Sequence, residues 1–216
     1  MSDTELLKLQ LDDLKKLHVD LEKQMIIFDE VLPYERQRTA LIYSPRLLNI
    51  MLTCCPQIES VITLIAQRCD IPLEYDNESG IKKSKSVRQL IREVNSKLVL
   101  SKFAIVSKTN GLLFTPFGSD LGWWQKYNEL KHKLATKQFE INYAVVMDAL
   151  AGLCGLYCLA DKLMSCFDRD IPEVLDSKNW VDSDYLIKIA NLDKQSTVNR
   201  YWESLLFVVT SFYKPY

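Results

Sequence analysis

The sequence predicts a mainly α fold, and three observations support that prediction. Apolar side chains recur with the period of an α-helix over three long stretches, residues 4–31, 44–68 and 140–165. Few other runs look like strands, and the clearest two flank Asn110-Gly111. The composition, 48% hydrophobic and 25% charged, is that of an ordinary globular protein. We therefore expect a helical bundle with one small β-hairpin near Asn110-Gly111.

Breaks in the pattern divide the chain into three expected parts. Pro33 ends the first helix, because proline lacks the amide hydrogen and clashes with the preceding turn. After Cys166 the composition becomes polar, and the apolar ending from residue 201 to 216 fits either a helix or a strand. The expected parts are an N-terminal amphipathic helix (1–32), a helical domain (33–168) and a C-terminal extension (169–216).

The first helix has a wide apolar stripe. Four apolar residues recur every seven positions and three more fill the same stripe: Leu7, Leu14, Leu21 and Phe28, with Leu11, Leu17 and Met25. A stripe this wide is typical of a helix that lies on a globular core, and a coiled coil is the alternative. His18 lies beside the stripe with no polar cluster around it, so we interpret it as a helix-surface histidine.

The second helix has a clear start signal. Ser44 is placed to cap it, with Pro45 in the first helical position, and apolar residues then form a broad face up to Ile65. Pro56 is expected to kink this helix. Glu59 is a polar exception within the apolar stretch, and it is either exposed to solvent or faces the polar cluster of a later helix.

The middle of the chain predicts a connection, a short helix and a hairpin. Residues 70–86 combine Pro, Gly, Asn, Ser and charges, which is typical of a flexible surface connection. Its lysines Lys82, Lys83 and Lys85 are solvated in this interpretation, with substrate contact as the alternative. A helix is expected from 87 to 98, followed by the hairpin, because Asn-Gly between two apolar runs favours a tight turn.

A polar cluster marks the helix expected from residue 122 to about 137, with Ser119 or Asp120 as its cap. Trp124, Asn128, Lys131 and His132 are spaced i, i+4, i+7 and i+8, so a helix places an indole, an amide, a cation and an imidazole on one face. The long helix that begins near Glu140 carries Ala and Gly residues that would let another helix approach closely.

Composition and targeting signals narrow the function. With 27 basic and 28 acidic side chains there is no global positive field for nucleic acid, so any such contact has to be local. The acidic, amphipathic N-terminus does not look like a signal peptide, and no apolar run reaches the roughly 18 residues of a membrane span. Six scattered cysteines lack CxxC spacing and favour reduced core thiols. We expect a cytoplasmic protein with no membrane partner, no metal site and no cofactor.

Residues 127–132, Tyr-Asn-Glu-Leu-Lys-His, resemble the Arg-Asn-x-x-x-His signature of the HEPN superfamily of small helical proteins. A group of uncharacterised bacterial proteins is similar over residues 40–165: Tyr43-Ser44, residues 55–59, Trp123-Trp124, Tyr127-Asn128, Lys131-His132 and residues 149–153. Asn128 and His132 occupy the superfamily's motif positions, whereas Tyr127 stands where the motif has arginine.

The resemblance implies a HEPN-type bundle that dimerises through its motif helix, and many HEPN proteins are metal-independent ribonucleases. It implies catalytic roles for His132 and Asn128, and substrate contacts from Lys126, Lys131, Tyr127 and Trp124, in a toxin or phage-defence system with a cognate partner protein. Metal-free RNA cleavage needs a base, an acid and positive charge against the phosphate, and lysine lacks the planar fork with which arginine grips a phosphate.

Two hypotheses follow. The first is a ribonuclease that works as a homodimer on RNA. The second is a helical dimerisation or binding module without catalysis, in which residues 127–132 are kept for packing and hydrogen bonding. A location for His132 in an open cleft with a second copy nearby favours the first, and a fully buried, hydrogen-bonded His132 favours the second. We also expect self-association because an exposed Trp123-Trp124 pair would be a costly apolar patch.

Overall fold

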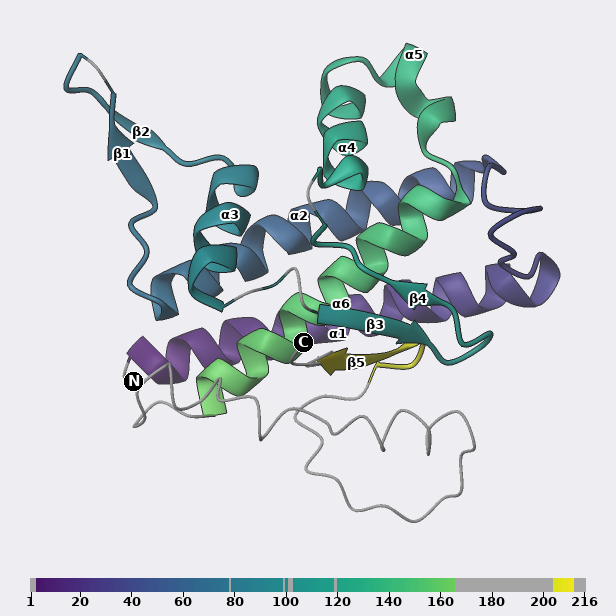
Figure 1. Ribbon diagram of the computed structural model, residues 1–216, viewed down its shortest axis with the longest axis horizontal. Helices are drawn as coiled ribbons and strands as arrows, with labels where there is room; N and C mark the ends of the chain where they lie inside the picture. The colour runs from purple at the N-terminus through teal and green to yellow at the C-terminus, as the bar shows by residue number, and fades with distance from the viewer. Residues whose placement is uncertain are drawn as a thin grey trace, which may run out of the picture.

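Helices dominate the computed structural model of the chain, as predicted, and two small antiparallel sheets accompany them (Figure 1). The structure describes residues 3–77, 79–98, 100, 103–118, 120–165 and 204–211. The helices are α1 (Asp3–Val31), α2 (Pro45–Arg68), α3 (Val87–Leu98), α4 (Gly122–His132), α5 (Leu134–Lys137) and α6 (Tyr143–Ser165). The strands are β1 (Glu74–Asp76), β2 (Lys82–Ser84), β3 (Phe103–Ser107), β4 (Leu113–Phe114) and β5 (Phe207–Ser211).

The core lies between α2 and α6, which pack against each other, with α1 in contact with both (Figure 1). Helix α4 packs on α6 and on the middle of α2. Helix α3 packs on α2, and among the described helices it has extensive contacts with no other. Two of the long stretches with helical periodicity, residues 44–68 and 140–165, thus form the centre of the core. The N-terminal helix belongs to this same core, since Leu11, Leu21 and Met25 are buried in it.

Helix starts agree with the sequence in one case and differ in another. Ser44 caps α2 by accepting a hydrogen bond from the amide of Arg46 at 3.2 Å, with Pro45 following it, as predicted. The cap predicted for α4 is wrong, because its N-cap is Leu121, in a left-handed conformation (φ 48°) without a side-chain hydrogen bond. The side chain of Leu121 is buried, so an apolar residue stands where the sequence predicted a polar cap. Pro56 lies inside α2, which continues past it.

Six of the seven stripe residues on α1 lie in or against the core, and one does not. Leu17 is 52% exposed, so it lies outside the stripe. His18 is completely buried, which contradicts its interpretation as a surface histidine, and Glu22, one turn further along, is completely buried too. The two side chains pair across that turn, with His18 Nε2 3.2 Å from Glu22 Oε1. A polar pair thus occupies the middle of the buried face.

Glu22 owes its burial to a segment at the far end of the chain. The hydroxyl of Ser204 and the amide of Leu205, the latter at 2.7 Å, both donate to its carboxylate. Burial alone would raise the pKa of Glu22, but the bonds from His18, Ser204 and Leu205 outweigh burial and hold that pKa below its ordinary value. Ser204 Oγ also accepts the amides of Leu206 and Phe207, so this polar cluster anchors the start of β5.

The three-stranded sheet has the order β4-β3-β5, and both pairings are antiparallel. Strands β3 and β4 form the predicted hairpin, with Gly111 at φ +69° in the turn, where glycine is favoured. Strand β5 settles the ambiguity of residues 207–211 in favour of a strand, with Ile105 of β3 opposite Val209. The rest of the predicted extension, apart from residues 204–206, lies outside the described residues.

Residues 70–86 contain structure that the sequence did not predict. Strands β1 and β2 pair antiparallel, with Tyr75 opposite Lys83. The side chain of Asn77 holds the turn by accepting the amides of Ser79 and Ile81 at 3.0 and 2.8 Å. The expectation of an unstructured connection was therefore wrong for these strands, because hydrogen bonds within the turn outweigh the polar composition. Lys82 and Lys83 are exposed, and Lys85 pairs with Glu93 at 2.6 Å.

The small residues of α6 do permit close packing. A Cβ added at Gly155 would lie 2.9 Å from Ile105 Cδ1 of β3. One added at Gly152 would lie 3.4 Å from Trp123 of α4 and 3.4 Å from Pro116. The close neighbours of α6 at these two positions are thus helix α4, as predicted, and in addition strand β3 and the loop that follows β4.

The cysteines lie in or near the apolar interior. Cys54, Cys55, Cys69 and Cys154 are buried free thiols, Cys158 is half-buried, and Cys166 lies outside the described residues. Burial raises the pKa of the Cys55 and Cys69 thiols, which keeps them protonated at neutral pH. In the described part of the chain, no group of three or more His, Cys, Asp or Glu side chains could hold a metal ion.

Two helices, Pro45–Arg68 and Tyr143–Asp161, are long and apolar enough to span a membrane by length and composition. In the structure, 61% and 83% of their apolar windows are buried inside the protein. Core helices of soluble proteins meet the same criterion, so the two helices are weak evidence of a membrane span. The cytoplasmic location stays a prediction.

Asp148 on α6 makes the stability of this packing depend on pH. Burial is the main cause that raises its pKa from 3.8 to about 6, the charge of Asp120 adds to the rise, and Arg36 opposes it. The folded chain therefore holds this proton to a higher pH than the unfolded chain does. Stability falls as the pH rises from 3.8 to about 6, and the full cost of ionising Asp148 remains above that range.

We expect Asp148→Asn to raise the free energy of unfolding near pH 8 by up to about 3 kcal/mol, at ~1.4 kcal/mol per pKa unit, and to change it little near pH 3.5. Urea unfolding at the two pH values measures the difference. Asp13→Asn, on the exposed side of α1, is the control and should show no such pH-dependent gain. An equal effect of Asp148→Asn at both pH values would contradict the assignment.

Candidate functional site

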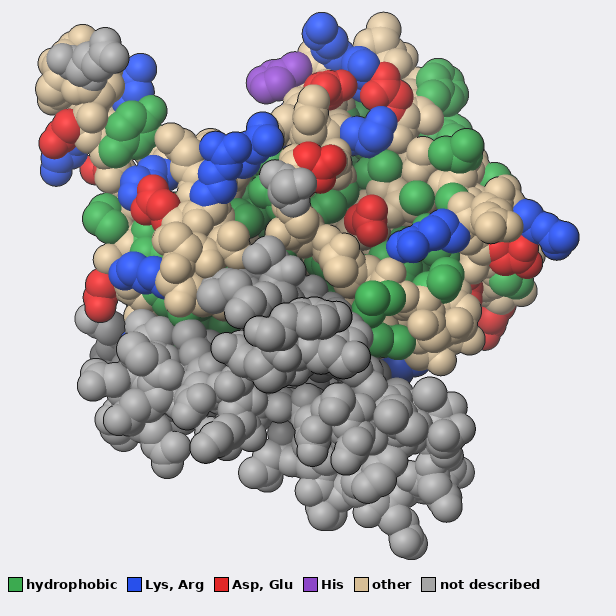
Figure 2. All heavy atoms as spheres, viewed as in Figure 1, with side chains coloured by type: hydrophobic (Ala, Val, Ile, Leu, Met, Phe, Trp, Pro, Cys, Tyr) green, Lys and Arg blue, Asp and Glu red, His purple; other side chains and the backbone are tan. Residues whose placement is uncertain are grey.

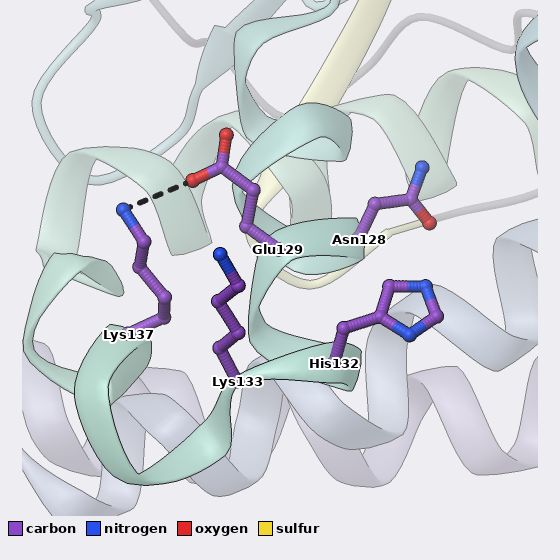
Figure 3. A pocket seen from close by; sticks show the side chains of 5 residues that line it. All are labelled: Asn128, Glu129, His132, Lys133 and Lys137. Atoms are coloured by element: carbon purple, nitrogen blue, oxygen red, sulfur yellow. Dashed lines mark ion pairs between the residues drawn. The ribbon is translucent and has the colours of Figure 1, made fainter.

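A hollow of about 430 Å³ lies at the C-terminal end of α4, where the chain turns into α5 (Figure 3). Five polar side chains line it: Asn128, Glu129, His132, Lys133 and Lys137. The chain makes this turn at Lys133, whose backbone leaves the helical conformation (φ −142°, ψ 49°). The break ends α4 at His132 and leads into α5, so two consecutive short helices build one open site.

Asn128 and His132 form one side of the hollow. They lie one helical turn apart, and Figure 3 shows both side chains projecting to the same side of α4, the imidazole beneath the amide. Both residues are exposed, so the imidazole nitrogens and the amide can reach a ligand from solvent. The sequence prediction that Asn128 and His132 share a face agrees with this arrangement.

The other side of the hollow carries charge. Lys137 Nζ lies 3.2 Å from Glu129 and 2.5 Å from Glu140. These hydrogen bonds raise the pKa of Lys137, and the bond from Lys137 lowers the pKa of Glu129. Lys133 lies between this pair and His132 in Figure 3, and among the described residues it forms no ion pair. Lys133 is thus the cation of the hollow that remains available to an anionic ligand.

The remaining residues of the predicted cluster lie elsewhere. Trp124 and Tyr127 are each only 3% exposed and pack on each other, with ring centroids 5.2 Å apart. Lys131 lies over the Tyr127 ring, its Nζ 4.9 Å from the centroid, and pairs with Glu59 of α2 at 2.8 Å. The interpretation that Glu59 faces the polar cluster is therefore confirmed. The hydrogen bond with Glu59 raises the pKa of Lys131.

The structure thus divides the predicted cluster into two groups with different surroundings. Trp124, Tyr127 and Lys131 join α4 to α2, whereas Asn128 and His132 line the hollow. Lys126 lies outside both groups and is 3.5 Å from Glu140. The predicted site did not include Glu129, Lys133 or Lys137.

The predicted apolar patch at Trp123-Trp124 is absent, because both indoles are buried, 4% and 3% exposed. Trp123 Nε1 donates to the carbonyl of Pro116 at 2.8 Å, which satisfies the polar atom of its ring.

Two other apolar side chains, close in sequence to the residues of the hollow, are exposed: Leu134 at 51% and Phe139 at 63%. Phe139 packs edge to face on Tyr43, with centroids 5.0 Å apart.

The hollow combines a proton-transfer group, a hydrogen-bonding amide and a cation without an ion-pair partner. An exposed imidazole can act as a general acid or base near neutral pH. Lysine charge can hold a phosphate, and an amide can orient it by a hydrogen bond. No protein-family model, no curated protein and no solved structure matches this chain.

Proposed function

We propose that the chain is a metal-independent endoribonuclease of HEPN type that acts as a homodimer, with His132 and Asn128 as its catalytic pair. The observation that carries the proposal is the exposure of His132 beside Asn128 in a hollow that also holds Lys133. An exposed His132 is the arrangement expected of the catalytic hypothesis, whereas the packing hypothesis requires a buried one. The resemblance of residues 127–132 to the HEPN signature supports the same chemistry.

In the proposed reaction, the 2′ oxygen of a ribose attacks the adjacent phosphorus and the 5′ oxygen of the next nucleotide leaves. A base takes the 2′-OH proton, an acid protonates the 5′ oxygen, and the products are a 2′,3′-cyclic phosphate and a 5′-OH. His132 performs one proton transfer, and His132 of a second copy performs the other. Asn128 donates its amide hydrogens to a phosphate oxygen, and Lys133 provides positive charge against the developing phosphorane.

In this proposal, residues other than Tyr127 provide the positive charge that the motif arginine would provide. Tyr127, at the arginine position, is buried beneath Lys131, and Lys131 is held by Glu59. Lys126 and Lys131 therefore contribute to the local field, while Lys133 makes the direct contact. Leu134 and Phe139, exposed next to the hollow, provide apolar surface for a second copy.

A non-catalytic binding module is the second candidate function. The contacts of Tyr127, Lys131 and Glu59 favour it, because they join α4 to α2 and account for part of the motif by packing alone. In that case the hollow would bind a partner or RNA without cutting it, in keeping with a role beside a cognate partner protein.

The test of the proposed function is incubation of the purified protein with mixed RNA in EDTA at low salt. We expect cleavage without added metal, detected by electrophoresis, and a rate that falls as salt is raised because phosphate contacts release counterions. Binding without cleavage under these conditions would favour the second candidate. Cleavage that requires a divalent metal would contradict the proposed mechanism.

A further inference from the structure

Helix α3 carries two exposed arginines for which the fold gives no structural partner. Arg88 and Arg92 are both exposed, and within the described residues neither forms an ion pair. They lie one turn apart and therefore share a flank of the helix. The apolar side of α3, with Leu90, Ile91 and Val94 buried, accounts for the stability of the helix without them.

The opposite flank of α3 is tied down by specific contacts. Glu93 pairs with Lys85 at 2.6 Å, and Lys97 donates to the carbonyl of Cys69 at 2.7 Å. Glu93 and Lys97 are also one turn apart, so they share the flank toward β2 and the end of α2. Arg88 and Arg92 are consequently left on the flank that faces away from the β1–β2 hairpin.

That free flank is turned toward α4. Both helices pack on α2, where Lys131 of α4 bonds to Glu59 and Lys97 of α3 bonds to Cys69. The two contacted residues, Glu59 and Cys69, are ten positions apart, which is about 15 Å along α2. Figure 2 shows Lys and Arg side chains over α3 on the side of α4, across a hollowed part of the surface from the projecting histidine. That histidine is His132, because His18 is completely buried.

The local charge supports a polyanionic ligand on this face. Residues 87–98 and 122–137 contain seven Lys or Arg side chains but only two carboxylates, Glu93 and Glu129, although the whole chain has a net charge of −1. Each of the two carboxylates is paired with a lysine, and Glu59 and Glu140, outside these ranges, pair with Lys131, Lys126 and Lys137. The cations of these ranges without an ion pair among the described residues are therefore Arg88, Arg92, Lys97 and Lys133. A strand of nucleic acid carries a phosphate about every 3.4 Å when stacked. The ~15 Å along α2 between its contacts with α4 and α3 therefore corresponds to four or five phosphates.

We propose that Arg88 and Arg92 bind the backbone of single-stranded RNA and lead it to His132, so that α3 adds guanidinium charge along the path of the strand while Lys133 contacts the reacting phosphate. This inference rests on the proposed function and adds its substrate-binding surface. Arginine is suited to the role, since its planar fork holds a phosphate by two parallel hydrogen bonds. A single strand is the expected substrate because attack by the 2′ oxygen needs a nucleotide that is free to leave helical stacking.

The test measures binding separately from cleavage. A fluorescent 2′-O-methyl RNA of about 12 nucleotides, which lacks the attacking hydroxyl, is titrated with wild-type protein and with an Arg88→Ala/Arg92→Ala double variant. We expect the double variant to bind about tenfold or more weakly at low salt, and the slope of log affinity against log salt to fall by about 0.7 per arginine. An Arg88→Lys/Arg92→Lys variant should retain most of the salt dependence, because it keeps both charges.

Arg38→Ala is the matched control, because Arg38 is an exposed arginine that precedes α2, at the end opposite to Cys69 and α3. It should bind as the wild type does, and circular dichroism should show all variants folded. The inference is overturned if wild-type protein does not bind the probe, if the double variant binds as the wild type does, or if Arg38→Ala weakens binding equally. Cleavage of ordinary RNA is measured in parallel, so arginine-dependent binding without cleavage refutes the nuclease while leaving this surface in place.

Discussion

Glu22→Ala is expected to lower the free energy of unfolding by about 3–5 kcal/mol, the cost of removing the carboxylate from a buried polar cluster whose other members bond to it. The substitution leaves the Ser204 hydroxyl and the Leu205 amide without their acceptor, and it leaves His18 without the carboxylate 3.2 Å away. His18 and Ser204 are buried, so water cannot replace the bonds that these two side chains lose. Chemical unfolding near neutral pH measures the change.

The loss should extend beyond α1, because Glu22 anchors the segment that leads into β5. Hydrogen exchange should show faster exchange of the backbone amides in the β3–β5 pairing than in the wild type. Glu30→Ala, an exposed glutamate on the same helix, is the control and should change stability by no more than about 0.5 kcal/mol. A loss below about 1 kcal/mol in Glu22→Ala would contradict a buried anchor.

The cluster around Glu22 also makes the stability of the fold depend on pH in the acidic range. The pKa of Glu22 is lower in the folded chain than its ordinary 4.5, so its contribution to stability is present above pH 4.5 and is lost as the pH falls through the folded-state value. The difference in stability between the wild type and Glu22→Ala should therefore shrink on acidification below pH 4.5.

His132→Ala is expected to reduce RNA cleavage by about 10²–10⁴-fold, the usual contribution of a positioned acid or base. Its melting temperature should stay close to that of the wild type, because the side chain is exposed and fills no part of the core. Asn128→Ala should reduce cleavage in the same direction, since its amide projects to the same side of the hollow. Activity assays and thermal unfolding on the same preparations separate the two effects.

Gln125→Ala is the control for His132→Ala, because Gln125 is exposed on the same helix but does not line the hollow. It should keep both activity and stability. A His132→Ala variant that is strongly destabilised, or that cuts RNA as fast as the wild type, would refute the catalytic role of His132.

Local sequence signals were sufficient for most of the helical framework. The cap at Ser44, the stripe on α1 and the Asn110-Gly111 turn depend on residues close in sequence, and the structure agrees with each. The burial of His18 and Glu22 could not be predicted in that way, since Ser204 is 182 residues from Glu22. Strand β5 was ambiguous for the same reason, because only its pairing with β3 distinguishes it from a helix.

The candidate site was predicted in part, for a geometric reason. Trp124, Asn128, Lys131 and His132 do lie on one side of an ideal helix, but that side spans about 100°. The boundary of the buried stripe passes through it, so Trp124 lies in the core while Asn128 and His132 face solvent. Lys137 was missed because the helix was expected to continue to that residue, whereas the break at Lys133 brings Lys137 to the hollow.

The most direct measurement of the central claim is the identity of the product ends in EDTA. An RNA oligonucleotide and its 2′-deoxy counterpart are incubated with wild-type and His132→Ala protein, and the fragments are analysed by mass spectrometry. The proposed mechanism predicts that the wild type cuts only the RNA and leaves a 2′,3′-cyclic phosphate and a 5′-OH. It also predicts that His132→Ala lacks this activity. Cleavage of the deoxy strand, or no cleavage of RNA by the folded wild-type protein, would contradict it.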